Sequence, residues 1–551
     1  MLAVALLLVH PVLGDPTRLA LGDPRNDVWN HVWGYAWVAD CVAEGRLPLH
    51  TELLNWPRGG SLWFIDLLGA LLTLPVQWVA GPVAAYNASY LLNWVLCGLG
   101  AYALALQVSG SRPGAILAGV AYMATPQLLG QATNGISETL AAGWLPLALL
   151  ALRHGWASPS AKKGALVGAV FALTALANWY YGLFAAMVAL GLLLREPFQR
   201  GRRKLAPMLG SATVVGGALV AAPLALFLGS IGAEDALVQR DSAFNWSTLV
   251  LHNMTDALAL VHPGKFYSPD LRESFGEHLI VVVSIGHALL WPALAALALA
   301  WREVRWWWAM ALGFTVLTLG PYLYVSGDYL QVSGGWVPLP FLALFEWVPG
   351  FSTISHPYRF AVGTSLALSV VLAVLVQKLG ERGLQPHLVA LVLGLGRLTE
   401  SLVGTAAVFP VPVARAEIPD LYASLDGGAV WDLPIGIGVL ERSQYGLFQL
   451  AHHQPIPYGL NDHIPLLLWT NRFARTLIEL ESSELATLPA ELPWLDIELG
   501  RRALVEDGMR WIVLHRSGYA SHQYPRVAGF LDQVAEPVYD EGDLRVYRLE
   551  P

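Results

Sequence analysis

Long apolar segments separated by short polar breaks make up most of the chain. Each is long enough, or nearly long enough, to cross a bilayer as a helix. They lie at 86–108, 115–128, 139–153, 164–177, 182–195, 206–228, 280–300, 306–323, 359–378 and 385–409. The region 164–195 must hold two of them, so we expect a hairpin of tilted or half-crossing helices there. Together with the apolar start of the chain, the pattern predicts an α-helical polytopic membrane protein with about eleven spans.

Two apolar stretches have more than one interpretation. Met1–Val9 has neither a basic region nor a small-residue cleavage motif, so we interpret it as a short or truncated first membrane helix and not as a removed signal peptide. Segment 61–80 is apolar apart from Asp66 and ends at a Gly-Pro pair. It predicts a second juxtamembrane helix, with a transmembrane span as the alternative.

The predicted first outer loop, 15–85, combines acidic and aromatic residues. Asp23 and Asp27 lie in and just after a Gly/Pro turn, and three tryptophans follow at four-residue spacing: Trp29, Trp33 and Trp37. This spacing places the indoles on one face of a helix and predicts a helix in the membrane–water interface, with carboxylates at the edge of the bilayer. A simpler interpretation is that Asp27 only caps this helix and the tryptophans anchor it.

The pattern changes at about residue 412. Short β-like runs such as 429–434 and 511–515 alternate with helical stretches such as 469–479 and 499–507. This alternation predicts a C-terminal α/β domain, 412–551, after a transmembrane domain, 1–411.

Composition supports a membrane protein. Hydrophobic residues make up 55% of the 551 residues and charged residues only 13%, whereas soluble domains carry about twice that charged fraction. The net charge of −8 comes with no basic cluster able to track a phosphate backbone, so no nucleic-acid partner is expected. With 2 cysteines, no disulfide framework is expected.

The charges in the loops predict the orientation. If the first helix runs outward, the basic loop residues share one side, which the positive-inside rule assigns to the cytoplasm. The N-terminus then lies inside, and the first loop and the C-terminal domain lie outside. These basic residues are Arg112, Arg153, Lys162, Lys163, Arg195, Arg200, Arg202, Arg203, Lys204, Arg302, Arg305, Lys378 and Arg382.

Polar and aromatic residues gather on the predicted outer side. Taken singly, each is more simply a cap, a hairpin tip or an interfacial anchor. Together they indicate a polar cavity, because charged groups beside membrane spans tend to face one. The set consists of Asn134, Glu138, Asn178, Trp179, Tyr180, His262, Glu277 and His278, with Arg359 at the outer end of a later span.

Other chemistries find little support. The chain has no GxxxxGK[ST] loop, no HExxH and no GxSxG. His262, Glu277 and His278 could form a metal cluster, but their spacing is loose. The adjacent His452 and His453 would point to opposite faces of a strand.

Short motifs over nearly the whole chain carry a family resemblance. They are Gly22-Asp23-Pro24 with Asp27, Leu47-Pro48-Leu49 leading to Trp56-Pro57-Arg58-Gly59, Gly143-Trp144-Leu145-Pro146-Leu147, His262-Pro263 with Glu277-His278, Pro357-Tyr358-Arg359-Phe360, Ile418-Pro419-Asp420-Leu421-Tyr422 and Trp431-Asp432-Leu433-Pro434. In these motifs the chain resembles the membrane glycosyltransferases of the GT-C superfamily, and within it the bacterial branch that includes YfhO-type proteins.

The resemblance implies transfer of a hexose or pentose from a polyprenyl-phosphate donor to an outward-facing glycan, lipid or protein acceptor. It also implies a bacterial inner-membrane protein in contact with membrane lipids, and a first-loop acid as catalytic base. That role falls on Asp27, with Asp23 as the neighbour that could replace it. Dependence on a divalent metal stays open, since no acidic pair elsewhere is an evident set of ligands.

The chemistry of such a transfer fits the residues. A carboxylate can take the proton that the acceptor loses as it attacks the anomeric carbon. A cation would stabilise the leaving phosphate, with Arg359 as the candidate and Arg58 or Lys265 as alternatives. The competing hypothesis is a non-catalytic protein on the same scaffold, either a carrier of lipid-linked glycans or an assembly factor.

Overall fold

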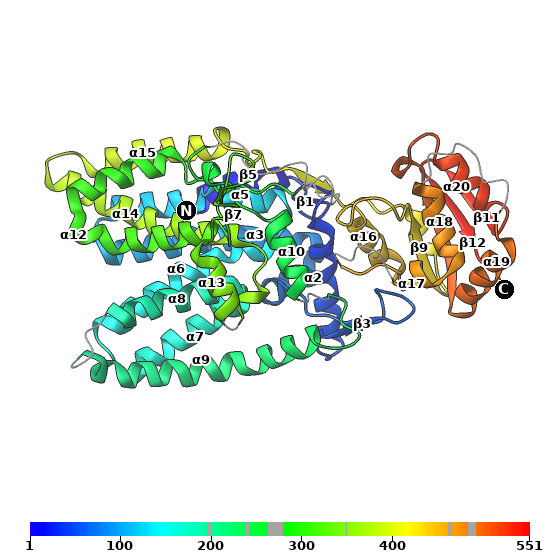
Figure 1. Ribbon diagram of the computed structural model, residues 1–551, viewed down its shortest axis with the longest axis horizontal. Helices are drawn as coiled ribbons and strands as arrows, with labels where there is room; N and C mark the ends of the chain where they lie inside the picture. Colours follow the sequence, from blue (N-terminus) through cyan, green and yellow to red (C-terminus); the bar gives the residue numbers. More distant parts are fainter. Residues whose placement is uncertain are drawn as a thin grey trace.

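The computed structural model describes residues 1–195, 201–238, 242–262, 279–348, 350–460, 466–482 and 492–550. Long helices lie side by side in a bundle, and a β-sheet with its own helices lies beyond one end of the bundle (Figure 1). The N-terminus lies in the bundle, and the C-terminus lies in the sheet part. The protein is therefore mostly helical, with a C-terminal sheet part set apart from the membrane helices.

The bundle is built around helix α14, which is buried over most of its length. Every residue of α14 from Ala361 to Val376 is buried, and its neighbours are α3, α4 and α12. The helices of the bundle are α1 (Leu2–Val9), α3 (Leu67–Ser109), α4 (Arg112–Met123), α5 (Pro126–Thr133), α6 (Trp144–Ala157), α7 (Ala161–Ala177), α8 (Trp179–Arg195), α9 (Gly201–Ile231), α12 (His287–Thr318), α14 (Ala361–Glu381) and α15 (Pro386–Val403).

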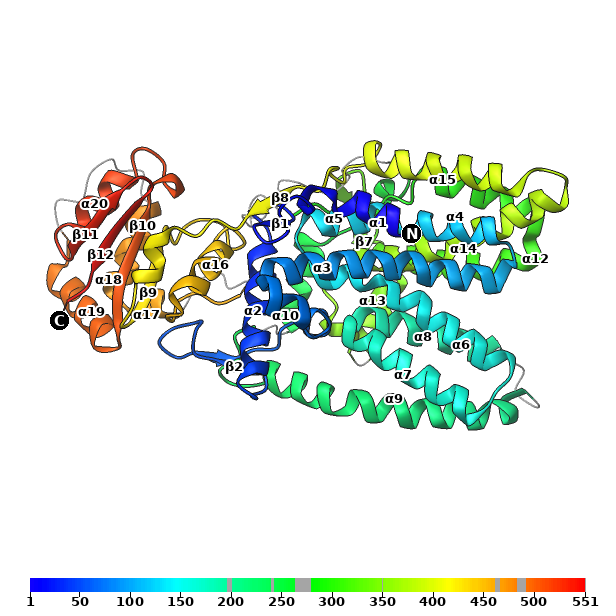
Figure 2. The ribbon, with the colours of Figure 1, turned by 180° about the vertical axis from the view of Figure 1, so that it is seen from behind.

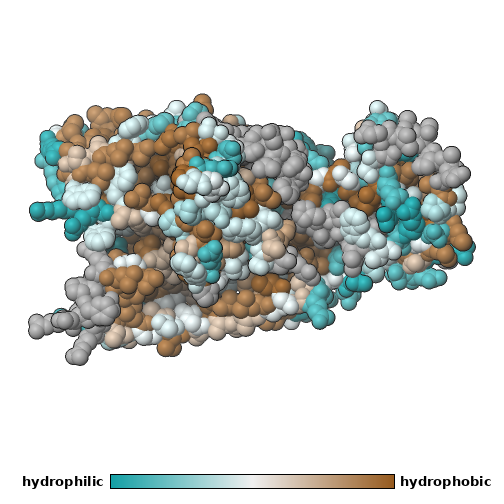
Figure 3. Space-filling view, in the orientation of Figure 1, coloured by the Kyte–Doolittle hydropathy of each residue, from teal (hydrophilic) through white to brown (hydrophobic). Residues whose placement is uncertain are grey.

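The outer helices expose apolar side chains, as expected of lipid-facing surfaces. Helix α9 packs mainly against α7 and leaves Val214, Leu219 and Leu228 exposed. Hydrophobic residues cover much of the bundle surface, while hydrophilic residues gather at its far end and on the sheet part (Figure 3). The protein is thus a multi-pass membrane protein.

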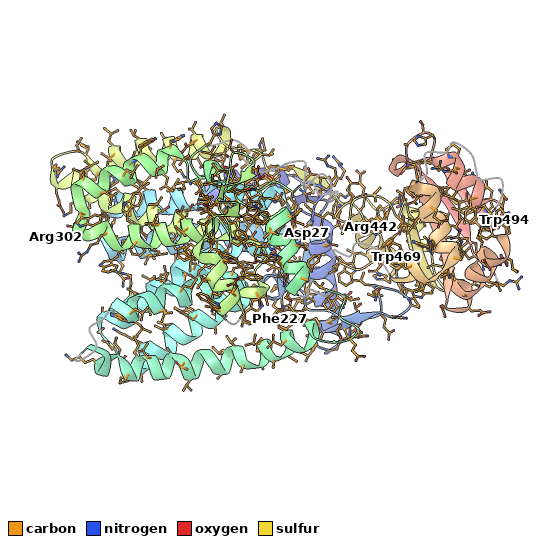
Figure 4. All side chains as sticks on the ribbon, viewed as in Figure 1. Asp27, Phe227, Arg302, Arg442, Trp469 and Trp494 are labelled. Atoms are coloured by element: carbon orange, nitrogen blue, oxygen red, sulfur yellow. The ribbon has the colours of Figure 1, made fainter. Side chains whose placement is uncertain are left out.

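Four of the described helices are long and apolar enough to cross a membrane: Leu67–Ser109, Lys204–Ile231, Pro357–Glu381 and Pro386–Val403. The total of about eleven spans stays a prediction. Arg302 lies at the end of the bundle away from the sheet part (Figure 4). The predicted orientation, with this end in the cytoplasm, also stays a prediction.

Several predicted helix boundaries are wrong, and proline or glycine explains two of them. The span predicted at 115–128 ends at Met123, and a new helix, α5, begins at Pro126, whose ring cannot continue the preceding helix. The helix predicted at 280–300 begins only at His287, after Gly286 with φ 84°. The start of 139–153 is a 3₁₀ helix, Ser137–Gly143, that precedes α6.

The predicted juxtamembrane helix 61–80 and span 86–108 form one helix, α3. Gly81, with φ 83°, kinks α3 at the predicted break. The segment 164–195 holds the two helices α7 and α8, as predicted.

The tryptophans of helix α2 (Val28–Ala43) are not the lipid-facing anchors that the sequence predicted, and whether α2 lies in the membrane–water interface stays a prediction. Trp29, Trp33 and Trp37 are only 1%, 1% and 2% exposed, and the helix lies between α3 and α16 (Ser443–His452). Trp33 stacks on Trp37 at 5.7 Å and donates a hydrogen bond to Gln449 of α16. The tryptophan face therefore holds the C-terminal part of the chain and does not anchor a helix in lipid.

The C-terminal sheet has the strand order β11-β12-β10-β9. Strand β9 (Ala429–Leu433) runs parallel to β10 (Met509–His515), and β12 (Leu544–Arg548) pairs antiparallel with both β10 and β11 (Glu536–Glu541). Helices α18 (Arg472–Ser482), α19 (Trp494–Glu506) and α20 (Tyr524–Leu531) lie beside it (Figure 2). This confirms a C-terminal unit of strands and helices, and its boundary at residue 412 stays a prediction.

Backbone pairing ties the C-terminal part to the first loop. Strand β8 (Val413–Arg415) pairs antiparallel with β1 (Leu19–Leu21). The amide of Ile456 donates to Leu53 O at 2.9 Å, and that of Trp56 donates to Ile456 O at 3.0 Å. These bonds and the α2–α16 contact hold the region around α16 over the first loop.

Shorter elements complete the described chain. They are β2 (His50–Thr51), β3 (Gly60–Ser61), α10 (Ser242–Ser247), β4 (Tyr324–Val325), β5 (Asp328–Tyr329), β6 (Gln331–Val332), β7 (Gly335–Trp336), α13 (Pro340–Trp347), α17 (Leu466–Thr470), the π-helical turn Thr248–His252, and 3₁₀ turns at His10–Val12, Ala257–Leu260, Phe351–Thr353, Pro357–Phe360, Asp420–Ser424 and Arg516–Gly518.

Candidate active site

The Gly/Pro turn of the first loop lies on the C-terminal end of α5. The amide of Asp23 donates to Thr133 O at 2.8 Å, and that of Asp27 donates to Asn134 O at 3.1 Å. The turn can approach α5 this closely because the two residues in closest contact, Gly22 and Gly135, are both glycines. A Cβ on Gly22 (φ 124°) would lie 3.0 Å from Gly135 Cα. The start of α2 is thereby fixed against the bundle.

Asp27 is the residue at the N-cap position of α2, but its carboxylate does not cap the helix within the described part of the chain. Its Oδ1 accepts a hydrogen bond of 2.8 Å from the side chain of Asn30. The Asp27 side chain is 14% exposed. The simpler interpretation, in which Asp27 serves only as a cap, thus lacks its defining hydrogen bond.

His31 connects the first loop to the bundle. Its Nδ1 donates to Asp27 O at 2.9 Å and lies 3.9 Å from Asp27 Oδ2, while Nε2 donates to Glu138 Oε2 at 3.0 Å. Burial disfavours the charged imidazole, but the hydrogen bond to Glu138 and the charges of Asp27 and Glu138 outweigh it and raise the pKa of His31 to about 9. His31 is therefore a cation at neutral pH.

Glu138 is the centre of this charge network. Its side chain is 2% exposed, and its Oε1 lies 3.4 Å from a guanidinium nitrogen of Arg359. Burial would raise the pKa of Glu138, but the hydrogen bond from His31 and the charge of Arg359 lower it overall. Asn178 donates to the Glu138 carbonyl at 3.1 Å and so positions its backbone.

Arg359 lies at the start of the buried helix α14. Its guanidinium stands over the Tyr180 ring at 5.0 Å, a cation–π arrangement. Its Nε is buried and has no hydrogen-bond partner among the residues that the structure describes. The residue thus keeps donor capacity beyond its pairing with Glu138.

A second buried carboxylate lies beside this network. Asp66, at the start of α3, accepts a hydrogen bond of 2.7 Å from the Tyr35 hydroxyl and another from Ser137. Burial raises the pKa of Asp66 to about 6, although these two hydrogen bonds and the charge of His31 act in the opposite direction. Ser137 precedes Glu138, so one 3₁₀ helix contacts both clusters.

Three other predicted site residues have structural partners in the same region. Both carboxylate oxygens of Asp23 accept hydrogen bonds from the guanidinium of Arg25, and the distance from Asp23 Oδ2 to the nearer guanidinium nitrogen is 2.9 Å. The side-chain amide of Asn134 donates a hydrogen bond to Ile280 O at 2.8 Å and accepts one from Ile280 N at 2.7 Å. Trp179 stacks on Phe227 of α9 at 5.5 Å.

The remaining predicted residues are either exposed or outside the described part of the chain. Arg58 is exposed in the loop between β2 and β3, and its side chain makes no contact with the network within the described ranges. His262 is exposed after the 3₁₀ turn Ala257–Leu260. Lys265, Glu277 and His278 lie outside the described residues. No group of three or more His, Cys, Asp or Glu side chains that could hold a metal occurs in the described part.

Reasoning from the sequence placed Glu138, Asn178, Tyr180 and Arg359 in one polar set and Asp27 in the first loop, and the structure brings these residues into one region. It missed His31, although a histidine four residues after Asp27 on the same helix was a usable signal. Asp66 was noted only as a break in an apolar segment. A buried carboxylate in such a segment was itself a signal for a functional or paired group.

No family model and no curated protein matches the chain. Among solved structures, the fold is similar to that of the arabinofuranosyltransferase AftD from Mycobacteria, with a TM-score of 0.60, 16% identity and all of this chain covered. The chain spans 39% of the length of AftD.

Two weaker likenesses have a TM-score of 0.49. One is to the oligosaccharyltransferase of Archaeoglobus fulgidus, with 13% identity, covering 94% of this chain and 69% of that one. The other is to ArnT of Cupriavidus metallidurans bound to undecaprenyl phosphate, with 12% identity, covering 100% of this chain and 97% of that one. Identities this low inform on the fold alone. By its likeness to AftD, the chain has the fold of the GT-C membrane glycosyltransferases.

Proposed function

We propose that this protein is a membrane glycosyltransferase. It takes a hexose or pentose from a polyprenyl-phosphate-linked donor and transfers it to a glycan, lipid or protein acceptor on the outer side of a bacterial inner membrane. The N-terminus would lie inside and the C-terminal domain outside. The fold supports this reaction class, and the charge network at the first loop supports a site for it.

The observation that carries the proposal is the position of Asp27. Its carboxylate lies at the start of a buried, rigid helix, remains partly exposed, and faces side chains instead of capping the backbone. A general base needs a fixed position and an accessible carboxylate. His31 Nδ1 lies 3.9 Å from Asp27 Oδ2, so the carboxylate has a fixed partner on its own helix.

The proposed reaction uses the groups already in place. The acceptor hydroxyl or amine attacks the anomeric carbon and gives its proton to Asp27, while the bond from that carbon to the phosphate oxygen breaks. The polyprenyl phosphate leaves with the bonding electron pair, and Arg359 stabilises its charge. Glu138 holds Arg359 and His31 in place, so it acts as a positioning residue. Asp23, bound to Arg25, is the less suitable base.

The experiment that tests this function uses the full chain in lipid nanodiscs with radiolabelled undecaprenyl-phosphate sugars and a membrane extract as acceptor source. Transfer of label from the lipid fraction to the acceptor fraction is expected. Binding of the lipid without any transfer or release of sugar would favour a non-catalytic carrier instead. The orientation is tested separately with a reporter that is active only in the cytoplasm, fused after Pro551, which should be inactive.

A further inference from the structure

A cavity of about 430 Å³ lies in the C-terminal part, outside the charge network. Its walls come from the segment Glu417–Pro419, from α16 and from the end of β10. The volume falls in the range of ligand pockets, roughly 300–1,000 Å³. Tyr445 and Phe448 of α16 form an apolar wall, and their rings stack against the imidazole of His515 at 5.6 and 5.4 Å.

A buried carboxylate orients His515 toward this cavity. Asp432, at 0% exposure, accepts hydrogen bonds through Oδ1 from His515 Nε2 (2.9 Å) and from the Tyr422 hydroxyl. Its Oδ2 is buried with no partner among the described residues. His515 Nε2 is bonded to Asp432, and the other ring nitrogen, Nδ1, lies 3.9 Å from Asp543 Oδ2. Such a polar pair is costly to bury and is not needed to hold a strand.

The rim of the cavity is rich in hydrogen-bonding groups and contains no Lys or Arg among its described lining residues. Asp543 is held by the amide and hydroxyl of Ser517 at 2.7 and 2.8 Å. Gln444 and Glu417 also line the cavity, and both are exposed. Two carboxylates, an amide and a hydroxyl around an aromatic wall disfavour an anionic ligand and suit a neutral one with many hydroxyl groups.

We propose that this cavity binds a saccharide. Its carboxylates and amide accept and donate hydrogen bonds to sugar hydroxyls, while the apolar face of the ring packs on the aromatic wall. The pocket also adjoins the first loop: Ser443, next to Gln444 on α16, donates to Asn26 O at 3.4 Å. That the saccharide is part of the acceptor glycan rests on the proposed function, whereas saccharide binding itself does not.

The test measures binding without any transfer reaction. Full-length protein in lipid nanodiscs, free of sugar detergents, is examined by saturation-transfer difference NMR with four methyl glycosides: α-D-arabinofuranoside, α-D-mannopyranoside, β-D-galactopyranoside and β-D-glucopyranoside. At least one should receive saturation from the protein. The double variant Gln444→Ala/Asp543→Asn, both at exposed positions, should weaken its binding roughly tenfold, since hydrogen bonds to charged groups contribute on that order.

The matched control is Glu536→Gln, an exposed acid on β11 away from the cavity, which should bind as the wild type does. No saturation transfer to any of the four glycosides, or equal binding by the double variant, would overturn the saccharide site and leave the proposed transfer untouched. If the site binds and transfer occurs, the double variant should raise the KM for the acceptor glycan and leave kcat unchanged. If the KM of the double variant were unchanged, the saccharide bound in this cavity would not be part of the acceptor glycan.

Discussion

Replacing Glu138 by Gln should loosen the candidate site without changing its shape. The carboxylate faces two cations, His31 at 3.0 Å and Arg359 at 3.4 Å, and all three side chains are at most 10% exposed. Removing one partner of a buried ion pair costs about 3–5 kcal/mol, because an uncompensated charge stays buried. Gln keeps the volume, and Arg359 keeps its contact with Tyr180, so we expect the lower end, about 3 kcal/mol.

The loss should appear as local opening. A change of about 3 kcal/mol multiplies the open population by roughly a hundred. Hydrogen exchange of the full chain in nanodiscs, read on peptides covering the start of α2 and the 3₁₀ helix Ser137–Gly143, measures this directly. Glu52→Gln, at an exposed acid of the first loop, is the control and should leave exchange unchanged. Protection within about twofold of wild type in Glu138→Gln would refute the network as an energetic unit.

Three further predictions follow from the structure. Arg359→Ala should lower the affinity for undecaprenyl phosphate at least about tenfold, as measured by native mass spectrometry, while Arg302→Ala, at the other end of the bundle, should not change it. If Arg359→Ala bound the lipid as tightly as the wild type, Arg359 would be a structural residue. Because the pKa of His31 is raised from its ordinary 6.5 to about 9, its stabilisation is complete below pH 6.5 and is lost as pH rises through about 9; the melting temperature by tryptophan fluorescence should fall over that range in wild type and less in His31→Gln, and equal slopes would contradict the ion pair. The isolated fragment 412–551 should unfold cooperatively, yet exchange rapidly around α16, which has lost its packing against α2. A fragment without cooperative unfolding would show that this part folds only on the membrane domain.

The membrane architecture was largely predictable because apolar length and periodicity are strong signals. The ends of the helices were less so. Pro126 and Gly286 end or delay helices at points where the apolar pattern continues, and hydropathy does not register a change of backbone direction.

The tryptophans of α2 show a different limit. Spacing correctly placed Trp29, Trp33 and Trp37 on a helix, but the same aromatic face suits lipid headgroups and a protein partner equally. The partner, α16, comes more than 400 residues later in the chain, as the Trp33–Gln449 contact shows. Local sequence carries no information on such a contact.

The candidate site was predictable as a set of polar groups on one side and not as a network. Glu138 and Arg359 are far apart in sequence, and their approach depends on how α14 and the 3₁₀ helix Ser137–Gly143 each pack against α3. Asn134 and Asn178 carried the same polar signal as Glu138. The structure shows their amides bonded to backbone, a distinction that residue type alone does not make.

The transfer assay on Asp27→Asn tests the central claim most directly. Asn keeps the shape of the side chain and its bond to Asn30, but it cannot take the acceptor proton, so turnover should fall by a factor of roughly a hundred or more. Folding should survive, because Asn occupies N-cap positions as well as Asp does. Asp23→Asn, which changes the neighbouring carboxylate bound to Arg25, should keep activity within about tenfold of wild type. Full transferase activity in Asp27→Asn, or a loss confined to Asp23→Asn, would contradict the assignment of Asp27 as the base.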